Sequence, residues 1–175
     1  IECFGYRIEQ KPLPGTLQIE RAVNLGVPKG PLLRDLKNGL DVTLEDGSVV
    51  KSTDVVEAEK KGFTVTVLGD TRYCEAAISL SQNADIVIHE ATFDAVNRQL
   101  AHDYGHATNV EAATVAKLAG AQNVLLTHIS ARFTEADVKL LLTEAKEVFE
   151  NSYIVHDLQR YDWKNNELHL QLPEK

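Results

Sequence analysis

The sequence predicts an α/β fold, because apolar strands alternate with amphipathic helices over residues 62–175. The strand candidates are short, largely apolar runs at residues 63–68, 84–89, 122–127 and 153–155. The helical patterns lie between these runs, at residues 74–82, 110–118 and 134–149. Because a crossover helix places successive strands side by side, we expect a largely parallel sheet.

Three smaller features extend this layer. Residues 1–10 include a run rich in β-forming residues, which predicts a further core strand. Thr134 is the expected N-cap of the last helix, with Asp137 three residues later. Residues 161–172 predict a terminal strand pair that turns at Asn165 and Asn166.

Residues 11–61 have a different character, because four of the five prolines in the chain interrupt them. The runs at 41–44 and 48–51 flank an Asp-Gly turn and predict a small hairpin, and residues 21–25 and 32–37 predict short helical turns. We expect a segment that does not build a core of its own and is therefore an insertion, a linker or a functional arm. Its first part, residues 11–38, carries five Lys or Arg against two Asp or Glu, a net charge of +3.

The composition excludes two broad classes of protein. The 175 residues carry a net charge of −8, which excludes a generally basic nucleic-acid coat but not a local basic patch. No run approaches the roughly 18 apolar residues of a membrane span. Two cysteines, Cys3 and Cys74, are too few for a disulfide scaffold, so we expect a cytoplasmic protein. Since the chain starts at Ile1 and contains no Met, we expect it to be part of a longer protein.

Polar side chains follow each predicted strand. They form the clusters GDTR at 69–72, HEAT at 89–92, THIS at 127–130 and HD at 156–157. In a parallel sheet all four clusters lie at the edge where α/β sheets bind ligands. Carboxylates and imidazoles there suit zinc or similar metals, and equally general acid–base catalysis; the simpler alternative is that they cap helices.

Histidines also occur in the segment 101–108, which we expect to be a polar loop carrying His102 and His106. Such a histidine is either a mobile proton donor or a solvent-exposed loop residue, and Thr108 is either functional or an N-cap.

Asp70 is the strongest candidate for a metal ligand, because a carboxylate held between Gly and Thr at a strand end can bridge two metal ions. His128 is the second, and His89, His106 and Glu90 are further possibilities. A two-metal site needs about six or seven protein ligands. The chain contains no His-x-His pair, so the site is either not metallic or completed by other residues.

These motifs resemble ribonuclease Z, the tRNA 3′-end-processing endoribonuclease family of the metallo-β-lactamase superfamily, over residues 3–157. Residues 69–72 are similar to the motif whose Asp bridges two zinc ions, which implies that Asp70 is a ligand. Residues 127–133 are similar to the final motif, which implies that His128 binds the second zinc and that Ser130 and Arg132 lie near substrate phosphate.

Two further segments resemble loops peculiar to this family. Residues 89–92 match its HEAT loop, and residues 106–108 resemble its His-Ser-Thr loop, with Ala107 in place of Ser. The resemblance implies that His106 donates a proton to the leaving oxygen, that Glu90 orients it, and that Thr108 lies on the substrate side.

The segment 30–39 fits the Gly-Pro-x4-Leu-x2-Gly pattern of the family's flexible arm, which grips the tRNA elbow. The resemblance therefore implies substrate contacts through a set of arm residues: Gly30, Pro31, Arg34, Leu36, Lys37 and Gly39. Phosphate contacts of this kind suit the local positive charge.

The resemblance implies the C-terminal half of an αββα sandwich, with residues 1–10 as a core strand, 11–61 as the inserted tRNA-binding arm and 62–175 as the remaining core. It implies a cytoplasmic, homodimeric endoribonuclease that cleaves the 3′ trailer from precursor tRNA, with two Zn²⁺ per complete subunit and no membrane partner. The family's His-x-His-x-Asp-His motif is missing here, so we expect this chain to be inactive alone. The alternatives are a non-catalytic tRNA-binding fragment and another metallo-β-lactamase-type phosphodiesterase.

Overall fold

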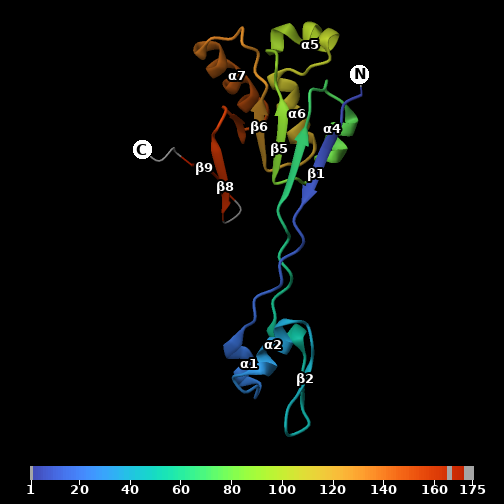
Figure 1. The fold of residues 1–175 in the computed structure, drawn as a ribbon, viewed down its shortest axis with the longest axis vertical. Coiled ribbons are helices and arrows are strands. Elements are labelled where there is room, and N and C mark those ends of the chain that lie inside the picture. The colour runs from blue at the N-terminus through green and yellow to red at the C-terminus, as the bar shows by residue number, and fades with distance from the viewer. Residues whose placement is uncertain (1, 165–166, 172–175) are drawn as a thin grey trace. The chain divides into compact units, whose positions relative to one another are not determined.

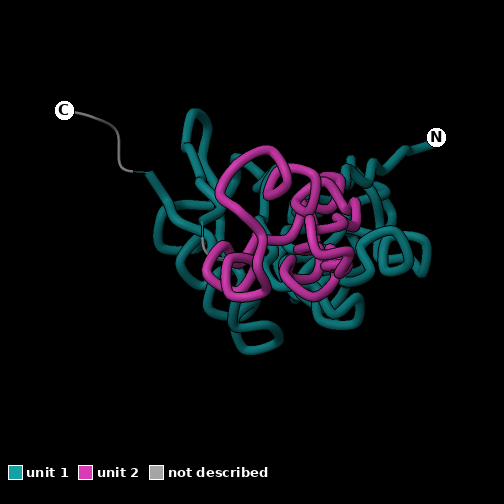
Figure 2. Tube along the Cα trace, turned by 90° about the horizontal axis from the view of Figure 1, so that it is seen from below, with its two compact units in different colours: residues 1–9, 63–175 teal, residues 10–62 magenta. Residues whose placement is uncertain are grey.

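The computed structural model describes residues 2–164 and 167–171. The chain forms two compact units, one made of residues 1–9 and 63–175 and the other of residues 10–62 (Figures 1 and 2). No helix in the described part is long and apolar enough to cross a bilayer.

The first unit is built on a five-stranded sheet in the order β1-β4-β5-β6-β7 (Figure 1). Its strands are β1 (Gly5–Glu9), β4 (Thr64–Leu68), β5 (Ile86–Glu90), β6 (Asn123–Thr127) and β7 (Ser152–Ile154). The strands β4 to β7 are parallel, as predicted, and β1 pairs antiparallel with β4. The carboxyl ends of the parallel strands therefore share one edge of the sheet.

Three helices pack on one face of this sheet: α4 (Glu75–Leu80), α6 (Asn109–Leu118) and α7 (Glu135–Val148). The strands contribute Leu68, Val87 and Leu126 to the core on this side. The alanines of α6 lie against them, and their small side chains let the helix approach the sheet closely. Thr134 and Asp137 form the capping box of α7 and confirm its predicted start.

The opposite face of the sheet carries a row of apolar side chains. Strand pairing aligns Tyr6, Val67, Ile88, Leu125 and Tyr153 across the five strands. Tyr6 is 64% exposed. No helix from the described residues belongs to a core on this face, which agrees with half of a two-sheet sandwich.

Strands β8 (Arg160–Lys164) and β9 (Glu167–Gln171) form the expected terminal hairpin, and Trp163 contacts the ring of Phe63. The predicted turn at Asn165 and Asn166, and Leu172, lie outside the described residues.

The prediction of a polar loop at residues 101–108 is wrong for the first half of this segment, which is helical. A 3-10 turn, η1 (Ala95–Asn97), leads into the helix α5 (Arg98–Tyr104). This helix is fixed by tertiary contacts, since Arg98 and His102 both bind Glu111 of α6. Local sequence patterns do not report contacts of that kind.

The second unit contains α1 (Ile19–Asn24), α2 (Pro31–Lys37), β2 (Val42–Thr43), β3 (Val49–Val50) and α3 (Ser52–Val55). The two strands pair antiparallel, as the predicted hairpin requires. The expectation that this segment builds no core is wrong. Six apolar side chains are buried together: Ala22, Val27, Leu36, Val42, Val50 and Val55. They are spread along the segment between its glycines and prolines, so no periodic run reveals them.

Candidate active site

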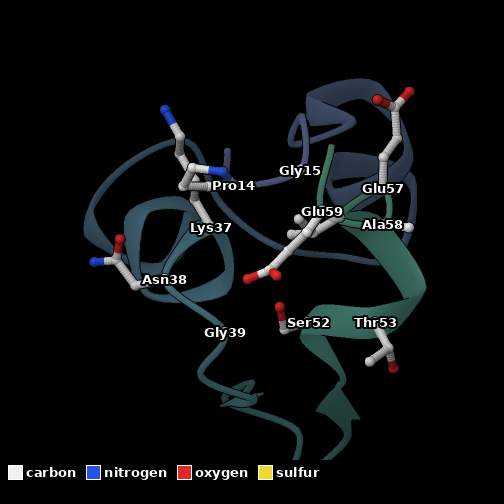
Figure 3. A pocket seen from close by; sticks show the side chains of 11 residues that line it. Pro14, Gly15, Lys37, Asn38, Gly39, Ser52, Thr53, Glu57, Ala58 and Glu59 are labelled. Carbon is white, nitrogen blue, oxygen red and sulfur yellow. The ribbon is translucent and has the colours of Figure 1, made fainter. Parts of the chain in front are cut away.

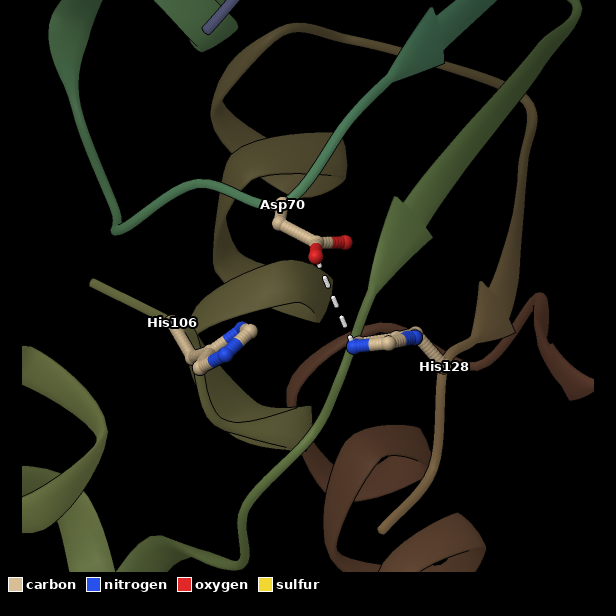
Figure 4. Close-up of side chains that lie close together, drawn as sticks. All are labelled: Asp70, His106 and His128. Carbon is tan, nitrogen blue, oxygen red and sulfur yellow. Dashed lines mark ion pairs between the residues drawn. The ribbon is translucent and has the colours of Figure 1, made fainter. Parts of the chain in front are cut away.

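Three polar side chains meet at the carboxyl edge of the sheet. Asp70 follows β4, His128 follows β6, and His106 precedes α6 (Figure 4). One ligand atom from each lies within 4.8 Å of the others. Figure 4 shows all three side chains pointing into the same space, with His128 Nε2 placed 3.5 Å from an Asp70 carboxylate oxygen. The edge thus gathers two imidazoles and one carboxylate. Asp70 and His128 come from two of the clusters at the strand ends, whereas His106 comes from the segment before α6.

His128 reaches this position through an unusual backbone. Its φ of 55° lies in the left-handed region, which costs a non-glycine residue about 1 kcal/mol or more. Such backbone strain is concentrated at functional sites. The imidazole remains about half exposed, which leaves it open to a ligand.

Glu90 is the acceptor that organises the site. It lies at the end of β5, 1% exposed. One carboxylate oxygen accepts the Thr71 and Ala107 backbone N–H groups at 3.1 and 3.0 Å and contacts His106 Nδ1 at 2.9 Å. The other accepts the Thr92 N–H at 3.0 Å and its hydroxyl at 2.8 Å. A carboxylate only accepts, so His106 donates its Nδ1 proton to Glu90 and turns Nε2 away from it.

A second buried carboxylate, Glu111, holds the other side of the His106 loop. It accepts the Thr108 N–H at 3.1 Å, and its own N–H bonds the Thr108 hydroxyl. Arg98 and His102 bind its second oxygen at 2.8 and 2.7 Å. Burial raises the pKa of Glu111, but these hydrogen bonds outweigh burial, and the net pKa lies below its usual range.

Thr108 is therefore the N-cap of α6 and is 1% exposed. This position does not fit the contact with substrate that we expected, because its hydroxyl is used inside the protein. Glu111 was missed by our reading of the sequence. Its place three residues after a Thr is the signal that could have found it.

Arg132 and Ser130 lie in the segment after β6. The Arg132 Nε donates to Ser130 Oγ at 2.9 Å, and the guanidinium lies over the ring of Phe93 at 4.6 Å from its centroid. Both contacts orient the guanidinium while leaving its terminal N–H groups available to an anion.

Two other clusters predicted at the strand ends place no histidine in the group of possible metal ligands. His89, a possible ligand, is fully buried in β5, where its Nδ1 lies 2.7 Å from the Glu90 carbonyl. The His156 and Asp157 pair is outside the group formed by the described His, Cys, Asp and Glu side chains.

The donors present suit a metal such as zinc, which binds imidazole and carboxylate and keeps an open position in catalytic sites. Asp70, His128 and His106 supply at most three ligands, fewer than two metal ions require. His106 enters this group, and it was among the further metal-ligand candidates, whereas the family resemblance implies proton transfer for it. The geometry allows either role.

The expected substrate contacts of the arm lie in the second unit. Gly30 and Gly39 flank α2 with φ of 155° and 86°, backbone conformations that favour glycine. Pro31, Arg34 and Lys37 are exposed, whereas Leu36 is fully buried in the core of the unit and does not fit a surface contact.

A hollow of about 660 Å³ lies beside the end of α2 (Figure 3). Lys37, Asn38 and Gly39 line one side of it, and residues from the segments 14–15 and 52–59 line the rest.

Residues 48–129 match the Beta-lactamase superfamily domain. Ribonuclease Z from Bacillus cereus (strain G9842) and from Bacillus thuringiensis (strain Al Hakam) are each 46% identical to the chain over 161 residues, which is 92% of this chain and 52% of theirs. The chain thus spans about half the length of the curated relatives it matches.

Among solved structures, the metallo-beta-lactamase fold protein YhfI from Bacillus subtilis is 37% identical and aligns with 54% of this chain and 37% of its own, with a TM-score of 0.47. Human tRNase Z, short form, is 30% identical over 63% of this chain and 34% of its own, with a TM-score of 0.41.

We predict that His89 makes the protein less stable in acid. Burial lowers the pKa of His89 below its ordinary value, against the opposing effect of its bond to the Glu90 carbonyl. Below a pH of about 6.5 the unfolded chain then takes up a proton that the folded chain refuses, so the free energy of unfolding falls by up to about 1.4 kcal/mol per pH unit.

Urea denaturation of the wild type and of His89→Gln at pH 7.5 and 5.5 measures this contribution. The variant should lose less stability between the two pH values, whatever its stability at pH 7.5. Equal losses would show that His89 is not kept neutral by burial.

Proposed function

Because the chain carries a β-lactamase-superfamily domain and resembles about half of ribonuclease Z, we propose that it is part of an endoribonuclease that removes the 3′ trailer of precursor tRNA. The observation that carries this proposal is the bond between Glu90 and His106 beside Asp70 and His128. It supports the proposal because an imidazole held by Glu90 can act as a proton donor beside candidate metal ligands, and metal-assisted phosphodiester hydrolysis requires both components.

Asp70 and His128 hold zinc in this proposal. Bound zinc supplies an activated water and stabilises negative charge on the phosphate. The remaining ligands come from the other half that the relatives possess. The apolar row on the face of the sheet opposite the helices supports this division, because it leaves Tyr6 64% exposed at one edge, where a second sheet would cover it.

His106 delivers the proton to the oxygen that leaves with the trailer. Its Nδ1 is held by Glu90, so Nε2 is the atom that faces the reacting phosphate. Glu90 cannot turn away, because four further N–H and O–H groups fix its carboxylate. The ring is thus held in one orientation before substrate binds, which is how a general acid becomes efficient.

Arg132 steadies a phosphate at or next to the cleaved bond, since its guanidinium is already oriented by Ser130 and Phe93. The arm binds the tRNA at a distance from this bond. Exposed Arg34 and Lys37 contact phosphates there, and Gly30, Pro31 and Gly39 fix the shape of the loop around them. The complete protein, by its resemblance, contains two zinc ions per subunit and acts as a cytoplasmic homodimer.

We predict that Asp70 is required for metal binding and His106 for proton transfer, so that substitutions at the two positions have different effects. In a protein that joins this chain to the other half found in its relatives, Asp70→Ala should lose bound zinc, measured by elemental analysis. His106→Ala should keep its zinc but cleave precursor tRNA about 10²-fold more slowly or worse.

Loss of zinc from His106→Ala would instead make His106 a metal ligand. A protein that binds tRNA but neither binds zinc nor cleaves would contradict the enzyme and favour a non-catalytic tRNA-binding module.

We predict that the arm acts on tRNA and not on the chemical step. The double substitution Arg34→Gln and Lys37→Gln leaves Leu36 and the core of the arm in place. It should weaken precursor tRNA binding and reduce the slope of log affinity against log salt by about 1.5 to 2, because two phosphate contacts are lost.

In the same joined protein, hydrolysis of bis(p-nitrophenyl) phosphate should stay unchanged, because this small diester has no tRNA elbow. The matched control, Lys117→Gln with Lys139→Gln, removes the same charge from exposed helix positions of the other unit. An equal effect of both pairs on tRNA binding, or loss of diester hydrolysis in the arm variant, would contradict the assignment.

A further inference from the structure

A cavity of about 290 Å³ opens beside His106 within the first unit. Its lining comes from the segment after β5, the helix α5 and the segment after β6: Thr92, Phe93, Leu100, Tyr104, His106 and Arg132. His106 therefore has the candidate metal ligands on one side and this cavity on another.

Tyr104 is the most unusual part of the lining. It ends α5, just before Gly105, and its side chain is 72% exposed. Leu100, four residues earlier on the same helix face, is also exposed and lines the same cavity. Exposed aromatic and apolar groups in a cavity beside a reactive side chain favour a binding role over a structural one.

The helix that presents Tyr104 is held rigidly. Arg98 and His102 bind the buried carboxylate of Glu111 at 2.8 and 2.7 Å, and these bonds fix α5 against α6. The ring is thus displayed on a fixed element and not on a flexible loop, so little entropy is lost when a ligand contacts it.

The other wall is flat and cationic. Phe93 is 3% exposed beneath the guanidinium of Arg132, which lies 4.6 Å from its centroid. The Arg132 Nε donates to Ser130 Oγ, one face of the guanidinium plane is covered by Phe93, and Arg132 lines the cavity. A phenol ring and a guanidinium plane are both side-chain surfaces on which nucleobases stack.

We propose that this cavity binds the first base beyond the cleaved bond of the RNA. This assignment rests on the proposed function, in which His106 gives its proton to the oxygen that leaves with that nucleotide. The nucleotide attached to that oxygen is the one nearest to His106. Its base stacks on Tyr104 and contacts Leu100, while Arg132 stays close to the phosphate.

The test uses the protein that joins this chain to the other half found in its relatives. Its substrates are precursor tRNAs that differ only in the first trailer nucleotide, which carries either uracil or no base. Tyr104→Ala should lower kcat/KM about 5- to 150-fold on the uracil substrate, the effect of losing one stacked base. It should leave the abasic substrate unaffected. Tyr104→Phe keeps the ring and should retain wild-type values on both substrates.

The matched control is Val96→Ala, because Val96 is 88% exposed near α5 but does not line the cavity. It should behave as wild type on both substrates. An equal loss by Tyr104→Ala on uracil and abasic substrates, or no loss on either, would overturn the proposal. A change from dimer to monomer in Tyr104→Ala, measured by light scattering, would also overturn it, because the surface would then be a protein contact.

A binding measurement separates this proposal from the proposed function. With 2-aminopurine as the first trailer base, stacking in the cavity quenches its fluorescence in the wild type but not in Tyr104→Ala. Quenching without any cleavage would support the cavity and refute the endoribonuclease. Cleavage without quenching and without dependence on the base would refute base binding in the cavity but leave the proposed endoribonuclease function intact.

Discussion

The carboxylate of Glu90 is the single acceptor on which three loops of the site converge. It is buried at the end of β5 and receives backbone or side-chain donors from Thr71, Thr92, His106 and Ala107. Each donor left unpaired in this interior would cost about 1–3 kcal/mol, so the loops are stable only when they meet around it. The same contacts that close the edge of the sheet therefore also aim His106 at Asp70 and His128.

Elements with a clear local signal were predictable from the sequence. The parallel strands follow from apolar runs between helical patterns, and Thr134 with Asp137 marks the start of α7. Features that depend on distant contacts were not predicted. The helix α5 depends on distant bonds to Glu111, and the left-handed backbone of His128 is too uncommon among non-glycine residues to be predicted from the sequence.

The closeness of Asp70 and His128 could be predicted because strand ends in a parallel sheet converge, whereas the position of His106 and the burial of each side chain could not. Thr108 and Leu36 resemble contact residues by motif, yet both are buried and stabilise their own segments. Among the described residues, three side chains form the ligand group, and Tyr6 on the apolar row of the sheet is exposed. Both observations support the proposed function, in which a second half supplies further ligands and covers this face.

The tautomer of His106 tests most directly whether Glu90 organises the site. Long-range ¹H–¹⁵N spectra of the metal-free protein, at a pH where this ring is neutral, report which nitrogen carries the proton. The account predicts a proton on Nδ1 in the wild type, because Glu90 accepts it, and a mixture of tautomers in Glu90→Gln. A wild-type ring protonated on Nε2 would contradict the account.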